Sequence, residues 1–146
     1  TVLESDSAPL IGLTEAMLAR SSAIRCMRDP TRGGLASALN EIAAASGVGI
    51  RINETALPMR ENVKGACEIL GLDPLYLANE GKLIAVVPPE FADEVIGAMR
   101  AHPAGREAAV IGEVVESPSG IVMLNTGFGG GRIVDLLVGE QLPRIC

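Results

Sequence analysis

The chain has 146 residues, which is room for one domain or two very small ones. Hydrophobic residues make up 48% of it and charged residues 21%, so the composition excludes an intrinsically disordered protein and predicts a packed core. Aromatic residues are only 2% and the formal net charge is −6. A nucleic acid is therefore not an expected partner, because stacking rings are scarce and the field repels phosphates.

Apolar residues that recur every three or four positions predict helices over residues 9–20, 30–46, 60–70 and 89–101. Alternating or uniformly apolar runs predict strands over residues 48–52, 83–87, 108–115 and 121–125. The run at 83–87 is typical of a central strand, and turn formers at 116–120 predict that the last two strands form a hairpin. The expected fold class is α+β, an α/β sandwich in which helices cover a mixed β-sheet.

We expect one domain over residues 1–138 and a flexible tail over residues 139–146. A glycine-rich segment, 127–131, precedes the last apolar stretch, and with Arg132 it suits either an anion cradle or a turn that lets the tail swing. Extended, the seven residues after Gly139 span roughly 24 Å at about 3.4 Å each. Such a tail can reach another domain or another protein.

No apolar run approaches the roughly 18 residues of a membrane span. Three cysteines and one histidine, His102, offer neither a disulfide framework nor a metal site, and we interpret Cys26 and Cys67 as small core residues. We therefore expect a soluble protein in the cytoplasm. Because the sequence begins with Thr1 rather than Met, we also expect a processed form or a fragment.

Cys146 is the last residue of the sequence. A thiol on a mobile arm is a nucleophile that can be loaded in one site and processed in a second. Arg144 favours its thiolate, while the α-carboxylate disfavours it, so activation has to come mainly from the site that it enters. Composition alone favours a frayed end that happens to finish in Cys.

The helix expected at 30–46 begins with residues that suit an anion. Asp29 can cap it with Pro30 in the first helical position, and Arg32 adds positive charge. Gly33 and Gly34 would let a bound phosphate approach the free N–H groups, although each costs on the order of 1 kcal/mol relative to Ala. A capped helix whose glycines permit close packing explains the same residues, and the sequence leaves both interpretations open.

Glu80 lies in the run Asn79-Glu80-Gly81, just before the expected strand at 83–87. A carboxylate at a strand entrance can act as a general base if its surroundings raise its pKa. A solvated glutamate in a turn is the commoner explanation of such a residue.

Taken together, Asp29-Pro30-Thr31-Arg32-Gly33-Gly34-Leu35 and Pro143-Arg144-Ile145-Cys146 resemble the HypE family of hydrogenase maturation proteins, in the aminoimidazole ribonucleotide (AIR) synthetase-like superfamily. The resemblance runs from about Met27 to Cys146, and Asn79-Glu80-Gly81 fits the family's glutamate motif. It implies the AIR synthetase C-terminal domain fold. It also implies an N-terminal half, with no counterpart in this sequence, that supplies most ligands of ATP and Mg²⁺ and the contacts of a homodimer.

The same resemblance implies a chemistry. In that family the partner HypF carbamoylates the terminal thiol, and ATP-dependent dehydration turns the product into a thiocyanate. The cyanide then passes to iron at a HypC–HypD complex and becomes a ligand of the [NiFe]-hydrogenase. By the resemblance, Cys146 carries the substrate, Glu80 is the candidate base, and the residues near the ATP phosphates are Asp29, Thr31, Arg32, Gly33 and Gly34.

Two other functions stay open. One is a different ATP-dependent enzyme of the superfamily, which would act on a diffusible substrate and have no use for a thiol arm. The other is an interaction module whose tail docks into a partner. Changing Cys146 to Ala separates them, because only a carrier enzyme loses its product.

Overall fold

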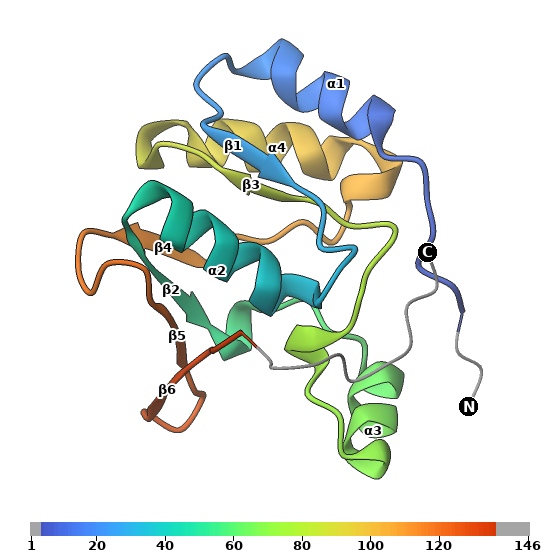
Figure 1. Ribbon diagram of the computed structural model, residues 1–146. Helices are drawn as coiled ribbons and strands as arrows, with labels where there is room; N and C mark the ends of the chain where they lie inside the picture. The colour runs from blue at the N-terminus through green and yellow to red at the C-terminus, as the bar shows by residue number, and fades with distance from the viewer. Residues whose placement is uncertain (1–3, 137–146) are drawn as a thin grey trace.

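The computed structural model describes residues 4–136 (Figure 1). Its α-helices are α1 (Ile11–Arg20), α2 (Gly34–Ser46), α3 (Glu61–Leu70) and α4 (Ala92–Ala101). Its strands are β1 (Cys26–Arg28), β2 (Gly49–Asn53), β3 (Ile84–Val86), β4 (Gly112–Val115), β5 (Val122–Asn125) and β6 (Gly131–Ile133). Short 3₁₀ helices are η1 (Glu54–Ala56), η2 (Pro74–Tyr76), η3 (Pro89–Phe91) and η4 (Pro103–Gly105). The four predicted helices are all present.

The strands form a four-stranded sheet in the order β4-β2-β5-β6 and a two-stranded sheet of β1 and β3. β2 runs antiparallel to β4 and parallel to β5, with Ile50 opposite both Val114 and Val122. The predicted α+β class with a mixed sheet and helices is therefore confirmed.

The predicted hairpin of 108–115 with 121–125 is wrong, because β2 lies between β4 and β5. The turn at 116–120 instead passes the start of β2, where the Gly120 N–H donates to the Val48 carbonyl over 2.8 Å. Turn formers show that the chain reverses, but they do not show whether another strand enters the gap.

The prediction of a central strand at 83–87 is also wrong. Within the described residues β3 pairs only with β1. Both faces of β3 are nevertheless packed. Ala85 packs against buried side chains of α1 and α4, while Ile84 packs against the buried side chains between α2 and the four-stranded sheet. Packing on both faces explains the uniformly apolar run without a central position in the sheet.

Helix α2 begins at Gly34, not at Pro30, and Asp29 does not cap it. Gly33 and Gly34 both have φ of 63°, a left-handed conformation that starts the helix four residues later than expected. A Cβ on Gly34 would lie 2.5 Å from the carbonyl oxygens of Leu75 and Leu77. The interpretation of close packing therefore explains Gly34.

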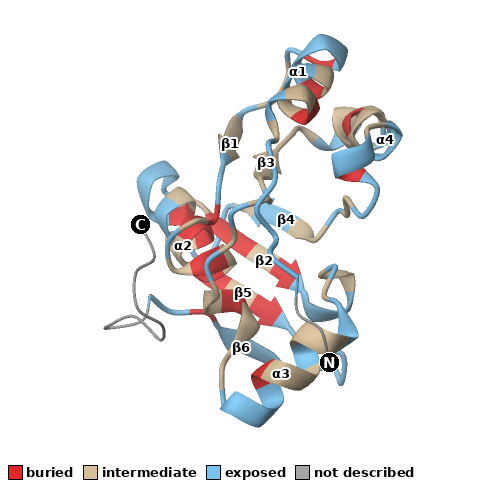
Figure 2. Cartoon of the chain, turned by 90° about the vertical axis from the view of Figure 1, so that its right-hand side faces the viewer, coloured by how far each residue is buried: buried red, intermediate tan, exposed pale blue. Residues whose placement is uncertain are grey.

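Two hydrophobic clusters form the core (Figure 2). The large cluster lies between α2 and the four-stranded sheet, and its buried residues are Ala36, Leu39, Ala43, Ile50, Ile52, Leu75, Val122, Leu124 and Val134. The small cluster lies among α1, α4 and the β1–β3 sheet, and its buried residues are Leu13, Met17 and Val95. Cys67 is buried and Cys26 half-buried. Among residues 4–136 no helix is long and apolar enough to cross a membrane.

Candidate functional site

Two connections between the clusters come together at one place. Residues 29–33 link β1 to α2, and residues 77–83 link η2 to β3. The Asn79 N–H donates to the Pro30 carbonyl over 3.0 Å, which ties the two connections to each other. The structure therefore brings Glu80 next to the 29–33 segment, although the two lie about fifty positions apart in the sequence.

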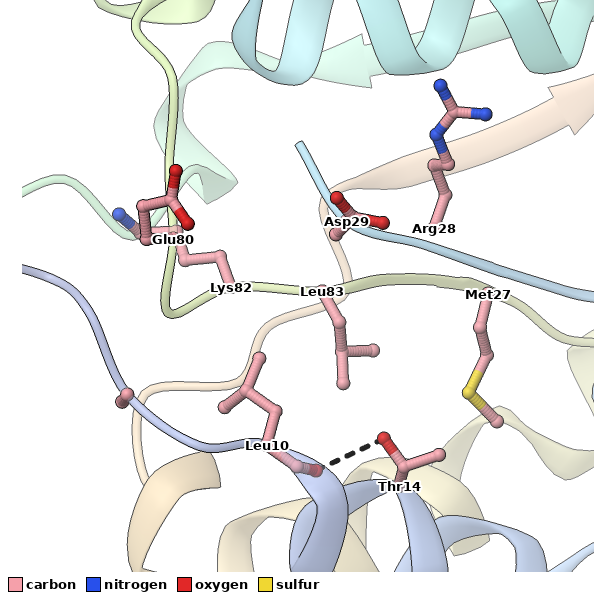
Figure 3. Close-up of a pocket in the computed structure, with 9 residues that line it drawn as sticks. Leu10, Thr14, Met27, Arg28, Asp29, Glu80, Lys82 and Leu83 are labelled. Atoms are coloured by element: carbon pink, nitrogen blue, oxygen red, sulfur yellow. Dashed lines mark hydrogen bonds between the residues drawn. The ribbon is translucent and has the colours of Figure 1, made fainter. Parts of the chain in front are cut away.

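A depression of about 350 Å³ lies at this junction (Figure 3). Leu10, Met27 and Leu83 give it an apolar side, while Asp29 and Glu80 lie on its polar side. Its remaining lining residues are Ala8, Thr14, Arg28 and Lys82.

A second depression of about 400 Å³ adjoins the first and is lined only by polar side chains. Its lining residues are Arg28, Asp29, Thr31, Arg32 and Glu80, three of which the first depression shares. We call the two together the junction site. It offers an apolar surface next to a charged one, an arrangement that suits a ligand with a phosphate group and a less polar part.

Two of the five charged side chains that line the junction site are already in ion pairs. Arg28 forms an ion pair with Glu41 of α2, and Lys82 contacts both the Asn79 side chain and the Asp6 carboxylate, the latter at 3.5 Å. These contacts fix the rim of the site without leaving those charges for a ligand.

Arg32 and Glu80 are different. Both side chains are exposed, and within residues 4–136 neither has a hydrogen-bond or ion-pair partner. A guanidinium is a bidentate donor to phosphate oxygens, and a carboxylate accepts protons, so the free pair supplies both an anion contact and a base.

The Asp29 carboxylate accepts a hydrogen bond from the Thr31 hydroxyl. This bond, with the Asp29 backbone N–H and the nearby Arg28 charge, lowers the pKa of Asp29 below its ordinary value of 3.8. The Asp29 carboxylate is therefore a weaker base than an ordinary aspartate, and its Thr31 bond holds it in place.

The N-terminal segment is a part of the site that sequence reasoning missed. The Glu80 N–H donates to the Asp6 carboxylate over 3.2 Å, and a Cβ on Gly81 would lie 1.7 Å from the Asp6 carbonyl oxygen. Gly81 is therefore needed where the chain at Asp6 crosses it. Gly81, directly after Glu80, was the only sign of this crossing that the sequence offered.

The other predicted residues lie elsewhere. Gly33 and Gly34 form the start of α2 and do not line the junction site. Arg132 is not free to cradle an anion, because it forms an ion pair of 2.6 Å with Asp73. His102 ends α4, where its Nδ1 accepts from the Ala104 N–H. Cys146 and the predicted tail at 139–146 lie outside the described residues.

Comparison with known proteins identifies the family. Residues 5–125 match the model of the "AIR synthase related protein, C-terminal domain". The chain belongs to this family. The resemblance that the motifs carried is confirmed.

Relatives of this AIR synthase C-terminal domain include carbamoyl dehydratases. The chain is 62% identical over 142 residues to "Carbamoyl dehydratase HypE" of Azotobacter vinelandii and covers 97% of itself and 42% of that protein. It is 46% identical over 144 residues to "Carbamoyl dehydratase HypE" of Escherichia coli, again with 42% of that protein covered. The chain thus spans less than half the length of these relatives.

Solved structures share the fold of this domain. The "Crystal Structure of Hydrogenase Maturation Protein HypE in complex with ATP" matches at a TM-score of 0.91 and 47% identity, covering 97% of this chain and 44% of that one. The "Crystal structure of HypE-HypF complex" matches at a TM-score of 0.88 and 49% identity, covering 92% of this chain and 44% of that one.

Proposed function

We propose that this chain is the C-terminal part of an ATP-dependent carbamoyl dehydratase that makes the cyanide ligands of a [NiFe]-hydrogenase in the cytoplasm. The observation that carries the proposal is that Arg32 and Glu80, neither of which has a side-chain partner among residues 4–136, line one site of a chain 62% identical to such a dehydratase. The complete protein would contain a further N-terminal part and act as a homodimer, with this chain contributing a domain over 1–138 and a carrier tail over 139–146.

The substrate would be carried on Cys146. HypF would transfer a carbamoyl group to the Cys146 sulfur, and the HypE–HypF complex found among similar structures supports this partner. The product is a thiocarbamate, S–C(=O)–NH₂. Its amide oxygen is a poor leaving group, so dehydration needs that oxygen to be activated.

ATP would supply the activation. The amide oxygen takes the γ-phosphoryl group and ADP leaves. The C–O bond then breaks with release of phosphate, while the two nitrogen-bound protons are removed and a C≡N bond forms. The balance is thiocarbamate plus ATP giving thiocyanate, ADP and phosphate. A HypC–HypD complex would then accept the cyano group as cyanide and would itself supply the two electrons that this cleavage needs, which returns Cys146 as its thiolate.

The junction site supplies the groups that this reaction needs. Glu80 would accept the first nitrogen-bound proton and the departing phosphate the second, and Arg32 would pair with the phosphate as charge shifts onto it. Asp29 and Thr31 fix the segment next to Arg32 through their hydrogen bond, and Gly33 and Gly34 turn it into α2.

Mg²⁺ would bind with the ATP phosphates. Asp29 is the carboxylate of the junction site that is left for such a cation, because Glu80 is needed as the base. Among residues 4–136 there is no group of three or more His, Cys, Asp or Glu that could hold a metal ion. Most ligands of the cation would therefore come from the N-terminal part and the phosphates.

Mass spectrometry of the peptide that contains Cys146 tests the proposal. The full-length protein, HypF, carbamoyl phosphate and ATP should give a carbamoyl adduct on Cys146, followed by ATP-dependent loss of water. A Cys146→Ala variant should form neither product. An unmodified Cys146 under conditions in which HypF is active would reject the carrier function.

The role of Glu80 has its own test. Glu80→Gln should be loaded normally but should fail to lose water, because an amide is not a base. Glu68→Gln on the exposed side of α3 is the matched control and should dehydrate normally. Normal dehydration by the Glu80→Gln variant would remove this carboxylate from the mechanism.

The same Cys146→Ala variant separates the alternatives. An enzyme with a diffusible substrate would keep most of its ATP-dependent activity in that variant. A docking module would tolerate Cys146→Ala but not the loss of residues 143–145.

A further inference from the structure

The segment of residues 77–83 holds the backbone of Glu80 in place and leaves its carboxylate open. Just before Glu80, the Asn79 N–H donates to the Pro30 carbonyl over 3.0 Å. At Glu80 itself, the backbone N–H donates to the Asp6 carboxylate over 3.2 Å. The Glu80 side chain has no hydrogen-bond or ion-pair partner in the part of the chain that the structure describes. A residue held in this way keeps its position while its carboxylate stays accessible to a substrate.

Asp6 and Lys82 surround Glu80 with polar contacts. The Oδ2 atom of Asp6 that accepts from the Glu80 N–H also lies 3.5 Å from the Lys82 Nζ. The Lys82 Nζ in turn donates to the side-chain oxygen of Asn79. Lys82 therefore joins Asp6 to the residue that precedes Glu80. Glu80 and Lys82 both line the first depression of the junction site (Figure 3).

The segment that carries Asp6 is itself fixed at both ends. A Cβ on Gly81 would lie 1.7 Å from the Asp6 carbonyl oxygen and 3.1 Å from the Ala8 nitrogen, so the two backbones cross in direct contact. Four residues after Asp6, Leu10 packs against the small cluster, and its carbonyl accepts from the Thr14 N–H over 2.9 Å at the start of α1. The position of the Asp6 carboxylate is thus set by packing on either side of it.

The contacts of Asp6 contribute little to folding. The Asp6 and Lys82 side chains are 40% and 52% exposed, and ion pairs at exposed positions add little stability. Position matters much more for a reaction, because a displacement of about 1 Å can slow catalysis on the order of a hundredfold. A variant without the Asp6 carboxylate should therefore fold normally and still misplace Glu80.

We propose that Asp6 is a positioning residue for Glu80. The inference rests on the proposed function, in which Glu80 accepts the first nitrogen-bound proton. By accepting the Glu80 N–H, the Asp6 carboxylate holds the backbone of Glu80 at the junction site, and Lys82 keeps that carboxylate turned toward the 77–83 segment. Asp6 lines neither depression, so it acts through Glu80 and not on the ligand.

The experiment measures a single turnover of dehydration in the full-length protein. The Cys146 thiol of each variant is carbamoylated with cyanate, so that no ATP is present before the reaction starts. Water loss from the Cys146 peptide is then followed by mass spectrometry over a range of ATP concentrations. Asp6→Ala should lower the maximal rate at least tenfold, while the half-saturating ATP concentration changes less than twofold.

Rescue by a conservative variant separates the hydrogen bond from the charge. Asp6→Asn should react within threefold of the wild-type rate, because its side-chain oxygen still accepts the Glu80 N–H. Asp6→Leu has the shape of asparagine without an acceptor and should be as slow as Asp6→Ala. Urea unfolding of all three variants should give the wild-type midpoint, and Asp6→Leu keeps the test valid if the alanine variant is unstable.

Glu4→Ala is the matched control. It removes the same charge from the same segment two residues earlier, and the exposed Glu4 lines neither depression. Its maximal rate should stay within twofold of the wild-type rate.

The positioning role is overturned if Asp6→Ala and Asp6→Leu react at the wild-type rate, if Asp6→Asn is as slow as they are, or if Glu4→Ala is equally slow. A large rise in the half-saturating ATP concentration would also overturn it and assign Asp6 to ATP binding. Glu80→Gln distinguishes this inference from the proposed function. Normal water loss in Glu80→Gln removes the base and the inference together, whereas a stalled Glu80→Gln beside an unimpaired Asp6→Ala rejects the inference alone.

Discussion

The two hydrophobic clusters differ in how completely they are buried. The large cluster has nine buried residues and six partly buried ones packed against them, whereas the small cluster has three buried residues and seven partly buried ones. The junction site lies where the chain crosses between them, on segments 29–33 and 77–83. Arg32 and Glu80, which have no side-chain partner in the part of the chain that the structure describes, therefore lie exposed at the edge of the large cluster, where a ligand can reach them.

The largest expected effect comes from the contact that joins α2 to η2 in the large cluster. Gly34→Ala should lower the free energy of unfolding by about 3–5 kcal/mol, because it combines a left-handed backbone with a collision against two carbonyl groups. Denaturant unfolding of the purified protein measures it.

Gly65→Ala is the control, since this glycine lies inside α3 with nothing within 4 Å of the added carbon. It should stabilise the protein by about 0.5–1 kcal/mol through helix propensity. Equal effects of the two alanines would show that α2 and η2 are not as closely packed as described.

A pair of leucines compares the clusters directly. Leu124→Ala in the large cluster should cost about 4 kcal/mol, and Leu13→Ala in the small cluster about 2 kcal/mol. The difference arises because partly buried neighbours relax into a cavity more easily than fully buried ones. Urea unfolding of both variants tests this, and a larger loss for Leu13→Ala would reverse the comparison.

Local patterns in the sequence predicted the helices well because each helix carries its own apolar periodicity. The same patterns failed for strand pairing. Nothing in residues 108–125 shows that β2, some sixty positions earlier, enters between β4 and β5. A strand's partner is decided by the packing of its faces, which is not a local property.

The candidate site shows the same limit. Family motifs pointed to Glu80 and to the 29–34 segment, and the fold brings Glu80, Asp29 and Arg32 together. The start of α2 was misplaced, because Gly34 packs in its left-handed conformation against the carbonyl groups of Leu75 and Leu77, about forty positions later in the sequence. The crossing at Asp6 was missed for the same reason.

At the boundary between the clusters, Arg32 should matter for binding rather than for stability. Arg32→Gln in the full-length protein should weaken ATP binding on the order of tenfold, because it removes a guanidinium of the junction site that has no partner among residues 4–136. Unfolding should change by less than about 0.5 kcal/mol. Titration calorimetry measures the affinity, with the exposed Arg106→Gln as the control of equal charge. Equal losses in both variants would show only a general charge effect.

The smallest expected effect is a shift in the pKa of Asp29, which lies in the same 29–33 segment as Arg32. The Thr31 hydroxyl is the main cause of the lowered pKa of Asp29, so Thr31→Val should raise that pKa toward 3.8, while Thr31→Ser should keep it low. Because the folded pKa is lower than the unfolded one, the ionised carboxylate stabilises the fold above about pH 3.8, and this contribution is lost as the pH falls through the folded value. NMR titration of the Asp29 carboxyl carbon in the three proteins measures it. An unchanged Asp29 pKa in Thr31→Val would mean that the Thr31 hydroxyl does not hold the Asp29 carboxylate. The 29–33 segment would then be less firmly fixed than the large cluster.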